Sequence, residues 1–249
     1  MNYKRIFTFG CSFTDYVWPT WADVVAYQTK IPTFNGGRSG IGNVGISCRI
    51  VEYDQKFKFT ADDLILVMWT SWTREDRYRN GDWLAGGNVF NNHFYDSQFL
   101  KRYWTWENDI IKNASAMIMV NKGYNIGDNY FALDIMENNR ELQSPLMDFY
   151  RNSLPTGAKF YIDQNFFDKK CIDGHPDILN HVQFYNDHVA TKFQLPLVED
   201  NSIFHKWQRH VETRINSKQS MSEQHDFFQN YFRRYKPALS IKYGADGGN

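Results

Sequence analysis

The sequence lacks both a net charge and long apolar segments. It has 249 residues, and 28 lysines and arginines balance 28 aspartates and glutamates. Without a basic excess, the chain has no overall positive field that would attract nucleic acid or an anionic membrane surface. It also has no apolar run of the roughly 18 residues that a membrane-spanning helix needs. We therefore expect no nucleic-acid partner and no membrane span.

Cysteine is scarce as well, which bears on the cellular compartment. Cys11, Cys48 and Cys171 are odd in number and far apart. This pattern argues against a disulfide framework and favours folding in a reducing cytosol, although a protein assembled into a particle would look the same. The chain also passes from Lys4 and Arg5 directly into an apolar segment, without a secretory leader. We expect a cytoplasmic protein.

Aromatic residues are abundant: they make up 17% of the chain, with 8 Trp, 15 Tyr and 20 Phe. Most large rings pack in protein interiors, so an aromatic-rich core accounts for many of them. Rings left at the surface suit the faces of sugars or a protein partner. Both uses remain open from composition alone.

The segment from Ile6 to Phe9 is apolar and rich in β-forming residues, as is typical of a central strand. Gly10 follows it, and we expect its backbone to adopt angles that a Cβ would forbid at a sharp turn. Ser12 would then lie at the carboxyl end of a strand, where open α/β sheets bind their ligands. Ser12 is a candidate nucleophile, and an ordinary solvated serine is the alternative.

Strands and helices alternate along most of the chain, which predicts a parallel, doubly wound sheet. A helix is expected over 20–29, and another is expected to begin at Asn43. The apolar stripe of the second helix would consist of Val44, Cys48 and Val51, joined by Ile50. The other expected elements are strands at 31–34, 64–69, 130–135 and 159–162, helices at 99–121, 137–152 and 179–189, and a loop or lid at 78–95.

A glycine-rich loop at 35–43 leads into the helix expected at Asn43. Free N–H groups and the positive dipole end of a helix N-terminus favour negative charge, so phosphate binding is one interpretation. However, the loop has neither a Walker pattern nor a Gly-x-Gly-x-x-Gly spacing.

Three polar turns follow predicted strands or open predicted helices, at Ser12, at 40–43 and at 173–175. A parallel sheet would gather them at one edge. Ester hydrolysis needs such a set, because a serine hydroxyl requires a base, a carboxylate that orients the base, and donors for the developing oxyanion.

These turns resemble the sequence blocks of the SGNH (GDSL-like) hydrolase family. Residues 9–14, Phe-Gly-Cys-Ser-Phe-Thr, are similar to the first block, with Cys11 where the family commonly has Asp. Residues 35–40 resemble the glycine block, and 173–176, Asp-Gly-His-Pro, resemble a shortened last block. The matching blocks span about 6–190, most of the chain.

The resemblance implies a three-layer α/β/α fold with a doubly wound, parallel, five-stranded sheet of the flavodoxin-like type. Residues 1–197 would form this SGNH hydrolase-like domain, and 198–249 a helical C-terminal extension packed on it. Trp21, the 40–43 turn and the 69–74 segment are similar to a subgroup found in bacterial and phage proteins. Homo-oligomer formation or virion association through the extension is therefore an alternative to a free cytoplasmic protein.

By the same resemblance, Ser12 would be the nucleophile, His175 the general base and Asp173 the residue that orients the base. The backbone N–H groups of Ser12 and Gly40 would form part of the oxyanion hole. The family's third block usually supplies an asparagine donor, which this chain lacks there. Asn43 is the expected replacement. The resemblance implies no cofactor and no metal.

The missing asparagine also permits a weak or inactive enzyme, because loss of one such donor typically costs on the order of a hundredfold in rate. A hydroxyl of Thr70 or Ser71 is another replacement donor. The residues expected to bind substrate are Trp69, Thr70, Trp72 and Arg74, with the rings of Tyr78 and Trp83 near the mouth of the site.

Two other chemistries compete with this interpretation. Cys11 could be the nucleophile, although alternate side chains of a strand point away from each other. A metal could draw on Asp173, His175, His181 and His188, although no His-x-x-x-His or Cys pair accompanies them. Asp173 could also simply cap the next helix.

Two functions are expected from the sequence. The first is a serine esterase that hydrolyses an O-acyl ester, such as an acetyl ester, on a carbohydrate or similar small molecule through an acyl-enzyme intermediate. The second is a weak or inactive SGNH-fold protein with a structural or carbohydrate-binding role, for example a phage particle component.

Overall fold

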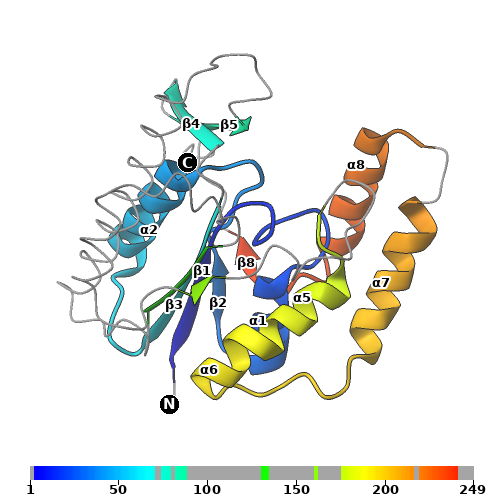
Figure 1. The fold of residues 1–249 in the computed structure, drawn as a ribbon, viewed down its shortest axis with the longest axis horizontal. Coiled ribbons are helices and arrows are strands. Elements are labelled where there is room, and N and C mark those ends of the chain that lie inside the picture. The colour runs from blue at the N-terminus through cyan, green and yellow to red at the C-terminus, as the bar shows by residue number, and fades with distance from the viewer. Residues whose placement is uncertain are drawn as a thin grey trace.

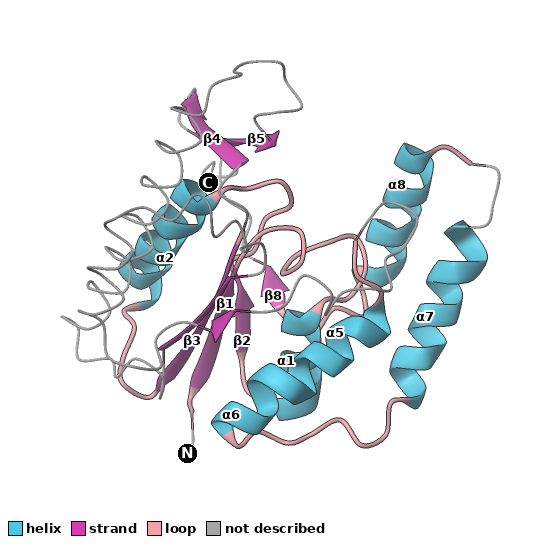
Figure 2. Cartoon of the chain, viewed as in Figure 1, coloured by secondary structure: helices cyan, strands magenta, loops and turns pink. Residues whose placement is uncertain are grey.

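A computed structural model describes residues 3–70, 74–79, 82–88, 130–134, 160–161, 175–215 and 219–240. Helices surround one parallel sheet (Figure 1), and Figure 2 shows the same arrangement by type of secondary structure. The helices predicted at 99–121 and 137–152 lie outside these residues. Within them, no helix is both long and apolar enough to cross a membrane.

The main sheet has the strand order β7-β6-β3-β1-β2-β8, and every pairing in it is parallel. This confirms the predicted α/β architecture with a parallel sheet. Strand β8 comes from the C-terminal extension and was not among the predicted strands. The bounds are β1 Arg5–Phe9, β2 Thr33–Asn35, β3 Asp63–Trp69, β6 Tyr130–Asp134, β7 Phe160–Tyr161 and β8 Leu239–Ser240.

Helices cover both faces of the sheet, with α2 on one side and α1 and α5 on the other (Figure 1). Helix α5 continues into a π-helical turn, η4, and then into α6. The bounds are α1 Trp21–Thr29, α2 Asn43–Phe57, α5 Ile178–Phe184, η4 Tyr185–Ala190 and α6 Thr191–Phe193.

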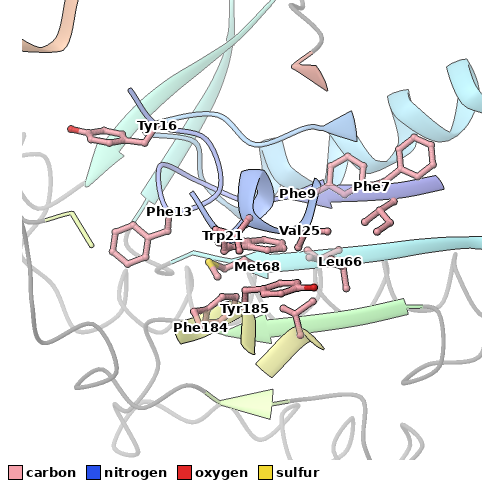
Figure 3. Close-up of a cluster of buried hydrophobic side chains, with 14 of the residues drawn as sticks. Phe7, Phe9, Phe13, Tyr16, Trp21, Val25, Leu66, Met68, Phe184 and Tyr185 are labelled. Carbon is pink, nitrogen blue, oxygen red and sulfur yellow. The ribbon is translucent and has the colours of Figure 1, made fainter. Parts of the chain in front are cut away.

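The two central strands are buried because both faces of the sheet are covered. Every residue of β3 is buried, as its unbroken apolar run predicts. On the α2 side, the ring centroids of Phe9 and Tyr53 lie 5.1 Å apart, and those of Phe7 and Phe57 lie 5.4 Å apart. On the opposite side, Figure 3 shows side chains of β3 gathered with side chains of α1, α5 and η4. The labelled members of that group are Trp21, Val25, Leu66, Met68, Phe184 and Tyr185.

The predicted apolar stripe of α2 is wrong except for Ile50. The helix buries Ile46, Ile50 and Tyr53, whereas Val51 is 37% exposed. Both stripes have the i, i+4, i+7 spacing of a helix face, so periodicity alone cannot choose between them. The contacts of Tyr53 with the rings of Phe7 and Phe9 decide which face is inside.

The prediction of a loop at 78–95 is also wrong for its first half. Strands β4 (Arg74–Arg79) and β5 (Asp82–Asn88) pair antiparallel, with Tyr78 opposite Trp83. The sequence does contain a hairpin signal, because Asn-Gly at 80–81 separates the two strands. The charged sequence of β4 concealed its strand character.

The C-terminal extension contacts the sheet domain at several places. It comprises α7 (Ser202–Ile215), α8 (Met221–Phe232) and β8, which pairs with β2 and forms the edge of the sheet. The ring of Trp207 in α7 lies 6.0 Å from that of Tyr27 in α1, centroid to centroid. The ring of Phe228 in α8 lies 5.7 Å from that of Trp18.

A buried carboxyl group, Asp23, lies at the start of α1. Its Oδ2 accepts a hydrogen bond from the backbone N–H of Thr20 at 3.0 Å, which caps the helix. Asp23 is 1% exposed, and burial raises its pKa to about 6, although the charge of Lys236 from the extension acts in the opposite direction. The folded protein therefore holds a proton on Asp23 in a pH range where the unfolded chain has released it.

We expect Asp23→Asn to change how stability depends on pH. The wild-type contribution of this group is fully present below its unfolded pKa of 3.8 and is lost as pH rises through its folded pKa of about 6. Relative to the variant, the wild-type free energy of unfolding should fall by up to about 3 kcal/mol over this range, since one pKa unit corresponds to about 1.4 kcal/mol. Urea denaturation at several pH values measures this difference.

Asp200→Asn supplies a control of opposite sign. Asp200 is exposed, and hydrogen bonds from the backbone N–H and side chain of Ser202 lower its pKa. The wild type should therefore gain stability relative to this variant as pH rises through the acidic range. If the Asp23→Asn difference moved in the same direction, the raised pKa of Asp23 would be refuted.

Candidate active site

Ser12 lies in a tight turn that follows β1. The N–H groups of Thr14 and Asp15 both donate to the carbonyl of Cys11, at 2.9 and 3.1 Å. Gly10 is required here for space, because a Cβ would lie 2.1 Å from Thr14 Oγ1 and 2.9 Å from the carbonyl oxygen of Met68. The prediction that Gly10 needs unusual backbone angles is therefore wrong. Among the described glycines, Gly40 has the positive φ, 79°.

The glycine-rich loop is hydrogen-bonded to the Ser12 turn. The N–H of Arg38 donates to the carbonyl of Gly10 at 3.0 Å, and the N–H of Gly36 donates to the carbonyl of Thr8 at 2.7 Å. The buried guanidinium of Arg49 in α2 holds the loop from behind, since its Nε donates to the carbonyl of Gly36 at 2.7 Å. The part of the glycine-rich loop that precedes the predicted 40–43 turn is therefore adjacent to the Ser12 turn.

Asn35 connects these segments through its side-chain amide. Its Oδ1 accepts from the hydroxyl of Thr8 at 3.2 Å and from the N–H of Gly37 at 2.9 Å. Its Nδ2 donates to the carbonyl of Thr14 at 2.9 Å. The residue is 2% exposed, so these bonds form away from water and fix the loop against the turn.

The hydroxyl of Ser12 is buried and free. The residue is 2% exposed, and its Oγ has no hydrogen-bond partner in the described part of the chain. In the same part, the backbone N–H groups of Ser12 and Gly40 donate no hydrogen bond. Buried polar groups are normally paired, and leaving one unpaired costs about 1–3 kcal/mol. An ester carbonyl would offer these donors an acceptor.

His175 packs against the same turn. Its ring stacks on that of Tyr16, with centroids 3.9 Å apart and planes 18° apart, and it meets the ring of Phe13 edge-on at 5.8 Å. The indole N–H of Trp18 donates to the carbonyl of Pro176 at 3.2 Å, which anchors the chain next to His175. His175 and Ser12 are thus brought to one place, but they are not hydrogen-bonded to each other. Asp173 lies outside the described residues.

The helix that follows His175 has its own N-terminal partners. Asp177 accepts a hydrogen bond from the N–H of Asn180 at 2.7 Å, and Gln208 of α7 accepts from the N–H of Ile178 at 3.0 Å. The capping role considered for Asp173 therefore belongs to Asp177.

Two further histidines follow on the same helical segment. His181 is 1% exposed, and burial, followed by the charges of His175 and Lys236, lowers its pKa to about 3. Burial also lowers the pKa of His188. Both rings are therefore neutral at pH 7. Within the described ranges, no three His, Cys, Asp or Glu residues lie together in a way that could hold a metal ion.

Asn43 and Thr70 join the start of α2 to the end of β3. The Nδ2 of Asn43 donates to the carbonyl of Thr70, and the N–H of Thr70 donates to Asn43 Oδ1, both at 2.9 Å. One amide hydrogen of the predicted oxyanion donor is thus already used. The Thr70 hydroxyl is buried and has no hydrogen-bond partner among the described residues, so it is the polar atom left over at the end of β3.

The predicted substrate-binding residues lie in different environments, and some lie outside the described residues. Trp69 is 3% exposed and belongs to the hydrophobic core. Arg74, the first residue of β4, is half-buried. Its backbone lies close to Gly42, because a Cβ added at that glycine would be 2.8 Å from the Arg74 carbonyl oxygen. Trp72 lies outside the described residues, and the side chains of Tyr78 and Trp83 lie outside them as well.

Asp76 is a residue that the sequence analysis missed. Its two carboxylate oxygens accept from the N–H groups of Gly42 at 2.7 Å and Gly45 at 2.8 Å. The N-terminus of α2, considered as a phosphate site, therefore already holds an anion from the chain itself. Burial raises the pKa of Asp76, while these two N–H groups act in the opposite direction. No local signal identifies it, because β4 is remote in sequence from α2.

We expect Asp76→Ala to lower the free energy of unfolding by about 1–2 kcal/mol, as loss of a helix cap does. The N–H groups of Gly42 and Gly45 would lose their acceptor in a partly buried place. Asp62→Ala is the matched control, because it breaks an exposed ion pair with Lys4 and should cost well under about 1 kcal/mol. Equal losses in urea denaturation would show that Asp76 is not a cap.

No protein-family model matches this chain, and no curated protein matches it either. The chemistry of the site must therefore be judged from its geometry. That geometry consists of a buried hydroxyl and two backbone N–H groups with no hydrogen-bond partner among the described residues, and an imidazole packed on the same turn.

Proposed function

We propose that this protein is a serine hydrolase of the SGNH type that hydrolyses a small O-acyl ester. The observation that carries the proposal is the environment of Ser12. Its hydroxyl is buried and unpaired at the carboxyl end of β1, and the ring of His175 is packed on the turn that holds it. A hydroxyl that serves only the fold would normally have a partner.

In this reaction Ser12 Oγ attacks the ester carbonyl, and His175 accepts the hydroxyl proton. The oxyanion accepts hydrogen bonds from the free N–H groups of Ser12 and Gly40. As the tetrahedral intermediate collapses, the bond to the alkoxy group breaks and His175 returns the proton to the leaving alcohol. Water then attacks the acyl-serine with His175 again as the base, which releases the acid and restores the hydroxyl. Asp173 is the proposed partner that orients His175.

The strand order supports the fold part of the proposal. Without β8, the order β2-β1-β3-β6-β7 matches the 2-1-3-4-5 order of flavodoxin-like sheets. In such sheets, ligands bind at the carboxyl ends of the strands, at the switch point between the first and third strands. Ser12 follows β1, which borders this switch point, and the glycine loop follows the neighbouring strand β2. Residues 1–197 would form this domain, and 198–249 its extension.

The proposed substrate is an acetylated carbohydrate or a similar small ester. The burial of Ser12 favours a small acyl group, because the residue has little contact with solvent. The aromatic richness of the chain suits a sugar as the alcohol. The protein would act in the cytoplasm, or on a virion if the chain is phage-encoded, with the extension as the contact to other subunits.

A second function is favoured by two other observations. Ser12 is 2% exposed and makes no hydrogen bond with His175, and Asn43 already uses its amide on Thr70. Both fit an SGNH-fold protein that is weakly active or inactive and binds a carbohydrate or serves in a particle. Although unligated active sites often have loose catalytic hydrogen bonds, this arrangement makes the alternative worth testing directly.

We expect Ser12→Ala to abolish both the hydrolysis of p-nitrophenyl acetate and labelling by a fluorophosphonate probe, because no other residue would form the acyl-enzyme. Ser39→Ala is the matched control, since Ser39 is an exposed serine of the glycine loop and should change neither. Intact-protein mass spectrometry measures the labelling.

The same labelling assay tests whether His175 is the general base or only a structural histidine. His175→Ala should slow labelling at Ser12 by about a hundredfold or more, as loss of a general base does. His205→Ala, which removes an exposed histidine of α7, should leave the rate unchanged. A wild-type protein that is neither labelled nor active would instead support the second function.

A further inference from the structure

The C-terminal extension reaches the candidate active site through Tyr16. Tyr16 is 8% exposed, and one face of its ring stacks on the imidazole of His175 at a centroid distance of 3.9 Å. Its hydroxyl lies 3.0 Å from Nε2 of His225, within hydrogen-bond distance. His225 belongs to α8, so a residue of the extension holds the ring on which the proposed base rests.

Two more contacts tie the extension to the same turn. The ammonium of Lys236 forms an ion pair with Asp15 Oδ1 at 3.1 Å and also donates to the backbone carbonyl of Tyr16. Burial disfavours the charge of Lys236, but the carboxylates of Asp15 and Asp23 raise its pKa above the usual value. The backbone carbonyl and the hydroxyl of Tyr16 are thus held by residues of the extension, and its ring is held by the stack described above.

We infer that Tyr16, held by His225, is a positioning residue that fixes the orientation of the His175 imidazole, so that the extension is part of the active site. The catalytic consequence rests on the proposed function. A histidine ring turns readily about its second side-chain torsion, whose energy wells are broad. A general base must aim one nitrogen at the proton it removes, and a flat ring stacked on one face restricts that rotation.

The chain contains a second stack of the same kind, which serves as a control. The rings of His210 in α7 and Tyr231 in α8 lie 3.7 Å apart with planes 17° apart. This pair contacts the rings of Phe227 and Phe232 within the extension. Tyr231→Leu therefore perturbs α8 and a histidine stack without touching Tyr16 directly.

The test compares Tyr16→Leu, Tyr16→Phe, His225→Ala and Tyr231→Leu. Tyr16→Leu should lower kcat on p-nitrophenyl acetate about tenfold with KM nearly unchanged, because a misaimed base affects the chemical step more than binding. Tyr16→Phe and His225→Ala keep the ring and should cost about threefold each, and together no more than either alone. Tyr231→Leu should retain wild-type kcat.

Two readouts separate positioning from loss of fold. The final extent of fluorophosphonate labelling counts competent molecules and should be the same in every variant, while the labelling rate of Tyr16→Leu falls. In NMR spectra, the ring protons of His175, assigned by their absence in His175→Gln, should lie upfield in the wild type and lose that shift in Tyr16→Leu. Ring-current shifts report the stack whether or not the protein is active.

Each possible result either supports or overturns the inference. Unchanged kcat and His175 shift in Tyr16→Leu, or an equal loss of kcat in Tyr231→Leu, would overturn it while leaving the proposed function intact. A wild-type protein that is not labelled at Ser12 would overturn the proposed function and the catalytic part of this inference. The His175 shift would then still decide whether Tyr16 orients the ring.

Discussion

The hydrogen bonds of Asn35 are the contacts on which the candidate site most depends. Its amide bonds to Thr8 in β1, to Thr14 beyond Ser12 and to Gly37 in the glycine loop. Its backbone carbonyl accepts from the hydroxyl of Tyr53 in α2 at 2.9 Å. A buried amide is tolerated only when its donors and acceptors are satisfied, so each segment is held in the one place that satisfies the others. The free N–H groups of the site are then oriented by the fold without a ligand.

The extension adds a second constraint, and it is electrostatic. Lys236 reaches from the segment after α8 into the space between Asp15 and Asp23, where burial makes an unpaired charge costly. Removing the lysine would leave the buried carboxyl group of Asp23 and the half-buried one of Asp15 without this positive charge. This arrangement explains why α8 and β8 dock on the Ser12 turn and on strand β2, and it makes the extension a continuation of the core.

Much of the fold was predictable because the relevant signals are local. The apolar run at 64–69 and the helical spacing at 20–29 correspond to β3 and α1. The buried face of α2 was not predictable, because two stripes have equal periodicity and distant rings select one of them. The hairpin was not predicted because the charged sequence before the Asn-Gly pair at 80–81 is atypical of a strand.

The site was predictable in its parts, but its supporting contacts were not. Ser12, the glycine loop and His175 were candidates because they lie in polar turns, and in the structure the loop and His175 both contact the turn that holds Ser12. The roles of Asp76 and Tyr16 depend on segments far away in the sequence, on β4 and on α8. Long-range pairing of this kind leaves no spacing pattern from which it could be inferred.

Three unpaired hydroxyl groups at one edge of the sheet support the proposal that this edge binds a ligand. Ser12 Oγ, Thr14 Oγ1 and Thr70 Oγ1 are all buried, and none has a hydrogen-bond partner in the described part of the chain. All three follow β1 or β3 at their carboxyl ends. Each unpaired group costs about 1–3 kcal/mol, and a ligand bound at this edge would offer these hydroxyls hydrogen-bond partners. An inert strand end would instead have paired these hydroxyls with nearby carbonyls, as Thr20 does with the carbonyl of Thr14 at 2.6 Å.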